Sequence, residues 1–148
     1  MNKFFLHSFI LVGLLCIGCA SMGRSEVSSP GSDFATAKRL VGDIFSLYSK
    51  FALNTFSDSI AQDFSPSRSS FINDAEKGAH AGDVLDMTFS LDQVLRSGEI
   101  LSIKIKWQKR IRPYGSSEVT LANGRAELVF KEQVEKWQLY QVTGQNPF

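Results

Sequence analysis

Few polar side chains in this 148-residue sequence have catalytic potential, and His80 is the first to consider. It is the one histidine beyond residue 20, and it lies between Gly78 and Gly82 in a segment typical of a loop. Its imidazole is either a solvated loop side chain, which we favour, or a general base at the mouth of a cavity. A single histidine excludes a His-rich metal cluster, and the sequence lacks nucleophile-elbow, dinucleotide-binding and phosphate-loop motifs. We therefore predict no metal and no cofactor.

Tyr48 is the second candidate, because it lies on the apolar side of a predicted helix. Apolar residues recur at steps of three and four over residues 33–53, which indicates a long amphipathic helix. We expect the Tyr48 ring to fill the core and its hydroxyl to meet a polar partner or a cavity water. Proton transfer through this hydroxyl would also need a base with a tuned pKa, and the sequence identifies none.

Four cations alternate along one predicted strand and therefore share one face of a sheet. They are Lys104, Lys106, Arg110 and Arg112. Lys109 adds a fifth positive charge nearby. We favour a solvated outer face on which these cations balance acids of neighbouring strands, such as Asp86, Glu127 and Glu132. The alternative is a docking surface for anionic lipid headgroups or for an acidic partner.

The N-terminal residues read as an export signal. Lys3 precedes an apolar run over residues 4–17, which is short for a membrane span and typical of a secretory signal. The following Leu15-Cys16-Ile17-Gly18-Cys19 resembles a bacterial lipoprotein signal, although Cys16 stands where leucine is usual. The alternatives are an ordinary signal cleaved near Ala20 or an uncleaved N-terminal anchor.

The resemblance to lipoprotein signals implies three parts of the chain. Residues 1–18 would be the signal peptide, residues 19–32 the lipidated Cys19 and a Ser-, Gly- and Pro-rich tether, and residues 33–148 a single domain. Several acyl chains on Cys19 would anchor the protein stably to a membrane. Because Ala20 rather than aspartate follows Cys19, the resemblance implies the outer membrane of a Gram-negative bacterium, with the domain facing the periplasm.

Cleavage before Cys19 would also change the composition of the domain. Cys16 would leave with the signal and Cys19 would be lipidated, so neither of the two cysteines would remain as a free thiol for a disulfide or a thiolate site. The loss of Lys3 would reduce the formal net charge from +1 to zero. Because the domain would be neutral and exported, a nucleic-acid-binding function is excluded.

Periodicity predicts an α+β fold. Two short helices should follow the long one, the first around residues 57–65, ended by Pro66, and the second over residues 67–77. Beyond residue 83 the apolar residues alternate, which predicts four antiparallel strands with the helices on the apolar face of the sheet. Asn123-Gly124 falls within the third of these strands and indicates either a hairpin turn or a bulge.

This order of elements resembles the nuclear-transport-factor-2-like superfamily, in which a curved sheet and a long helix form a cystatin-like cone. The likeness also depends on the Phe56-Ser57-Asp58 step after the long helix and on the closing strand over residues 137–144. It implies a conical cavity, and it allows a homodimer through the outer face of the sheet. The expected cavity-lining residues are Phe45, Tyr48, Met87, Phe89 and Trp107.

Function stays open on this likeness, because the superfamily includes isomerases, dehydratases, cyclases and non-enzymatic carriers. In ketosteroid isomerases, which this fold resembles, a first-helix tyrosine acts with an aspartate from a nearby strand. Residues 64–71 supply no such aspartate here. We therefore expect a lipid-anchored, non-enzymatic module that binds an apolar ligand or an envelope protein. The alternative is an isomerase- or cyclase-like enzyme that uses Tyr48 with an unidentified carboxylate.

Overall fold

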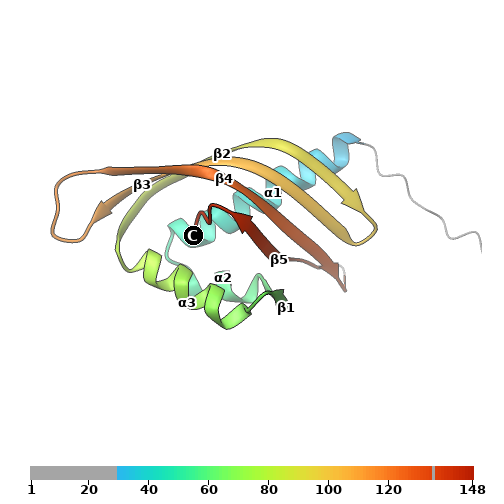
Figure 1. Cartoon of the computed structure of the whole chain (residues 1–148), viewed down its shortest axis with the longest axis horizontal. Coiled ribbons are helices and arrows are strands. Elements are labelled where there is room, and N and C mark those ends of the chain that lie inside the picture. The colour runs from blue at the N-terminus through green and yellow to red at the C-terminus, as the bar shows by residue number, and fades with distance from the viewer. Residues whose placement is uncertain (1–29, 135) are drawn as a thin grey trace, which may run out of the picture.

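A curved sheet covers three helices in the computed structural model, which describes residues 30–134 and 136–148 (Figure 1). The helices are α1 (Pro30–Ser49), α2 (Leu53–Asp58) and α3 (Arg68–Ala79). The strands are β1 (Ile60–Ser65), β2 (Gly82–Ser97), β3 (Ile100–Pro113), β4 (Thr120–Gln133) and β5 (Lys136–Gly144). The predicted α+β class with a curved sheet is confirmed.

The sheet has five strands in the order β1-β5-β4-β3-β2, so the prediction of four strands is wrong. The additional strand is β1, which pairs in parallel with β5, whereas all other neighbours are antiparallel. The spacing of Ile60, Ala61 and Phe64 suits the buried side of a short helix as well as a strand. In the structure these three side chains are buried, and Gln62 and Asp63 are exposed. Pairing with β5 decides the conformation, because long-range pairing overrides an ambiguous local pattern.

The long helix α1 ends at Ser49, before the predicted end near residue 53. Phe51 has a positive φ of 58° and donates its amide to the Tyr48 carbonyl, while the Ala52 amide bonds the Leu47 carbonyl. These two bonds form a Schellman motif, which ends a helix by satisfying its last carbonyls. Phe51 is therefore outside the buried stripe and half-exposed, with its ring 4.8 Å from the His80 ring.

Asn123 and Gly124 lie inside β4 and form neither a turn nor a bulge, so both predicted alternatives are wrong. They pair in continuous register with Gln108 and Trp107 on β3. A Cβ atom on Gly124 would lie 2.8 Å from the Trp107 ring, so glycine is needed here for close approach rather than for a turn. The register shifts near β3 lie on β2 instead, between Val84 and Asp86 and between Leu91 and Gln93.

The predicted signal peptide, the lipidated Cys19 and most of the tether lie outside the described residues. Helix α1 begins at Pro30, which falls within the predicted tether of residues 19–32. None of the helices built from the described residues combines the length and the hydropathy of a membrane span.

Candidate functional site

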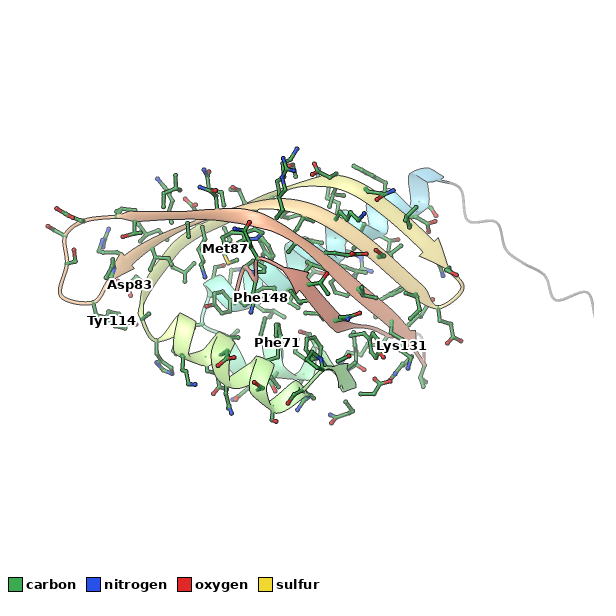
Figure 2. All side chains as sticks on the ribbon, viewed as in Figure 1. Phe71, Asp83, Met87, Tyr114, Lys131 and Phe148 are labelled. Atoms are coloured by element: carbon green, nitrogen blue, oxygen red, sulfur yellow. The ribbon has the colours of Figure 1, made fainter. Side chains whose placement is uncertain are left out.

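Aromatic rings fill the deep part of the space between sheet and helices. The Phe148 ring is buried at the centre of this group, and its centroid lies between 5.2 and 5.9 Å from the centroids of four other rings. These rings belong to Phe45, Tyr48, Phe56 and Phe71. Figure 2 shows Phe71 and Phe148 between the sheet and the helices. This part of the interior is therefore packed by the protein's own side chains.

Tyr48 places a polar group inside this apolar interior. Its side chain is 1% exposed, and its hydroxyl has no hydrogen-bond partner among the described residues. The hydroxyl lies against α3 at Gly78, where an added Cβ would be 2.8 Å away, so the missing side chain makes room for it. Burial raises the pKa of Tyr48 to about 12, because the interior disfavours the phenolate.

Lys109 is the functional candidate that sequence analysis placed on the wrong side of the sheet. We expected it near the outer cations, but it is 6% exposed and faces the interior, with its Nζ 5.2 Å from the centre of the Tyr48 ring. Burial lowers the pKa of its ammonium. Alternation along β3 contained the signal, since Lys109 follows Ile105 and Trp107 at steps of two and shares their face.

Beyond Lys109 the concave side of the sheet is less covered. In register, Met87 on β2 and Ala122 on β4 flank Lys109, and Val84 on β2 pairs with Ile111 on β3. All four apolar side chains are half-buried, and we call them the concave shelf. Figure 2 shows Met87 on the side of the sheet that faces the helices. Lys109 thus lies between the packed aromatic rings and an apolar surface that remains partly accessible.

The other expected cavity residues lie on the same face of the sheet. Phe89 is half-buried, with its ring 5.5 Å from the ring of Phe45. Trp107 is buried and donates its indole N–H to the carbonyl of Gln145 at 2.8 Å. Their role in lining a ligand cavity stays a prediction.

The four alternating cations lie on the outer face of β3 and are exposed. Lys106 forms an ion pair with Asp92 at 3.1 Å, and Arg110 donates to Asp86 through Nε at 2.6 Å. Lys104 and Arg112 stand opposite Glu127 and Asp83 in the strand register. Acids of neighbouring strands thus stand beside all four cations, and the docking role stays a prediction.

Grooves on the surface lie apart from Tyr48 and Lys109. One of about 290 Å³ lies between α1 and the β4–β5 region, with Leu47 and Trp137 on its walls and the charged Arg39 at its edge. Another of about 210 Å³ lies between α3 and β5. Neither is lined by the tyrosine or the lysine.

Acidic groups are missing from the interior of the described part of the chain. Lys109 is the one charged side chain in its core, so no described aspartate or glutamate side chain is buried beside Tyr48. The described residues also contain no group of three His, Cys, Asp or Glu side chains with the geometry to hold a metal ion. His80 is exposed at the end of α3, in contact with Phe51.

Solved structures provide the decisive comparison. A nuclear-transport-factor-2-like superfamily protein from Salmonella enterica serovar Typhimurium superimposes with a TM-score of 0.63 at 12% identity, covering 81% of this chain and 94% of that one. The chain has the nuclear-transport-factor-2-like fold. A ketosteroid isomerase-like protein from Erwinia carotovora atroseptica gives a TM-score of 0.62 at 10% identity, with 78% and 98% coverage.

Other similar structures have different functions. The beta subunit of benzoate 1,2-dioxygenase from Burkholderia mallei gives a TM-score of 0.59 at 13% identity, covering 76% of this chain and 89% of that subunit. No protein-family model matches the sequence, and no curated protein matches it. The comparisons therefore establish the nuclear-transport-factor-2-like fold, which supports several functions.

Proposed function

We propose that this protein is an exported, lipid-anchored binding module that holds an apolar small ligand on the concave side of its sheet. The observation that supports this function best is the concave shelf, where apolar side chains of three strands remain half-buried beside the packed rings. Apolar concave surfaces with a few polar groups are the usual binding sites for small molecules.

A non-enzymatic role is favoured over an isomerase- or cyclase-like one. An enzyme of that kind needs a base near Tyr48, and no aspartate or glutamate side chain of the described residues is buried with it. The charged group beside Tyr48 is Lys109. Its ammonium suits the binding of a hydrogen-bond acceptor rather than the role of a carboxylate base.

Retention of a ligand by the full-length protein tests the binding function. After gentle detergent extraction, native mass spectrometry should detect an apolar molecule bound to the wild-type protein. Ala122→Phe fills the concave shelf and should abolish this retention, whereas Leu121→Phe, at an exposed neighbouring position, should preserve it. Wild-type protein that carries no ligand would contradict the proposal and favour an envelope protein as the partner.

Anchoring through Cys19 is the second part of the proposal, and the lipoprotein-like Leu15–Cys19 segment supports it. Cys19→Ser should release the protein from the membrane fraction and abolish metabolic labelling with palmitate. Cys16→Ser is the matched control, because its thiol would leave with the signal peptide, and it should remain anchored. A Cys19→Ser protein that stays labelled and membrane-bound would contradict lipidation.

A further inference from the structure

Lys109 is a buried cation without an anionic partner. No ion pair or hydrogen bond joins its ammonium to any described residue, and its Nζ lies over the Tyr48 ring, 5.2 Å from the ring centre. A cation over an aromatic face gains some electrostatic stabilisation, but this is smaller than the cost of removing the charge from water. A buried lysine of this kind is stabilised when an anion binds beside it.

Tyr48 is a second unmatched donor at the same place. Its hydroxyl is enclosed and has no partner, so the O–H group has lost its water without gaining a hydrogen bond. An ammonium and a phenol O–H both donate, and both are complemented by an acceptor. The backbone carbonyl group of Phe148 lies beside the same part of Gly78 but forms no hydrogen bond with this hydroxyl. The two unpaired donors therefore favour a negatively charged acceptor that binds beside them.

The surroundings restrict the size and charge of that acceptor. Lys109 is the one buried base among the described residues, and the alternating cations of β3 project from the opposite face of the sheet. A phosphate would require more positive charge and more donors than this, whereas a carboxylate carries one negative charge. Val84, Met87 and Ile111 continue from Lys109 as an apolar surface suited to a hydrocarbon chain.

We propose that Lys109 and Tyr48 bind the carboxylate of an apolar monocarboxylic acid whose hydrocarbon chain lies along the concave shelf. This inference rests on the proposed function and defines its ligand class. Lys109 supplies the charge, the Tyr48 hydroxyl supplies a second hydrogen bond, and the shelf excludes water from the chain. A neutral ligand of the same length would keep the apolar contacts but leave the ammonium unpaired.

Photolabelling in membranes that contain the full-length protein tests this class. The probes are dodecanoic acid and dodecanol, each with a diazirine in the chain, and mass spectrometry locates the labelled residues. We expect the acid to label the shelf about tenfold more than the alcohol, since a hydrogen bond to a charged group changes affinity by about this factor. Lys109→Met should remove the preference for the acid, whereas Lys106→Met, on the outer face, should retain it.

Lys109→Arg keeps the charge and should preserve the preference for the acid, which separates loss of charge from loss of folding. Equal shelf labelling by both probes, unchanged in Lys109→Met, would overturn the carboxylate site and leave the proposed binding function intact. Absence of shelf labelling by either probe would overturn both. Circular dichroism and thermal unfolding verify that each variant is folded before its labelling is compared.

Discussion

A binding role and a stability role make opposite demands on Tyr48. Its ring contacts Phe56 and Phe148 in the core, so the aromatic part of the side chain stabilises the fold. The hydroxyl is buried without a partner and therefore opposes folding. A group that lowers stability without forming a bond in the free protein is typical of a site prepared for a ligand.

Removal of this hydroxyl should stabilise the protein. We expect Tyr48→Phe to raise the free energy of unfolding by about 1 kcal/mol, because the unmatched O–H is lost and the ring contacts remain. Urea denaturation of the ligand-free variant measures this difference. A less stable variant would mean that the hydroxyl has a partner in the folded protein. In the labelling experiment above, the same variant should bind the acid more weakly.

Alkaline pH should destabilise the protein through Tyr48. Its pKa is raised from 10.0 to about 12, so the unfolded chain loses this proton at a lower pH than the folded protein. The unfolding free energy should therefore be unaffected below pH 10 and fall between pH 10 and about pH 12, by on the order of 2 kcal/mol.

The lowered pKa of Lys109 acts in the opposite direction, because its ammonium is disfavoured in the folded protein and its deprotonation relieves that cost as the pH rises. Comparison with Tyr48→Phe isolates the tyrosine, since both proteins contain Lys109. The difference in unfolding free energy between them, measured by urea denaturation at a series of pH values, should widen above pH 10. Parallel pH profiles would refute the raised pKa.

Among the strands, close approach explains a glycine that the sequence assigned to either a hairpin turn or a bulge. Gly124 on β4 lies where the Trp107 side chain and Gln145 cross the strand, with both less than 3 Å from the position of an added Cβ. The same crossing holds the segment after β5, since the Trp107 indole and the Arg125 amide both donate to Gln145. The glycine therefore couples β3, β4 and the segment that leads to Phe148.

Two glycine substitutions should have opposite effects on stability. We expect Gly124→Ala to lower the unfolding free energy by about 1–3 kcal/mol, because the added methyl overlaps the Trp107 ring. Gly42→Ala in α1 meets no atom within 4 Å and should raise it by up to about 1 kcal/mol through helix propensity. Thermal unfolding of both variants measures the effects, and a stabilised Gly124→Ala would refute the close approach.

For the whole molecule, Phe148 joins the elements into one core. Its ring contacts side chains from all three helices, and Gly78 on α3 lies close to its backbone. The segment before it is bonded to the sheet through Gln145. The aromatic core therefore links the helical layer to the sheet and supports the inner end of the candidate ligand site.

Truncation of this ring should be among the most destabilising single changes. We expect Phe148→Ala to lower the unfolding free energy by about 3–5 kcal/mol, as large-to-small changes of buried aromatic residues do. Phe34→Ala is the control, because Phe34 is half-exposed and should change stability by less than about 0.5 kcal/mol. Denaturant unfolding compares the two, and similar values would contradict a central role for Phe148.

Local periodicity predicts most of the helices and strands and the face that each strand buries. The three-four spacing around Tyr48 and the alternation around Trp107 each reflect one buried side, which local periodicity records directly. The same alternation also marks Lys109 as a residue of the buried face, but we expected it near the outer cations because of its charge, and the structure corrects this. The folded arrangement was needed to show that residues 60–65 form β1, that Gly124 allows close packing and that Phe148 fills the core. Each of these features depends on contacts between segments distant in the chain, whose pairing no local pattern encodes.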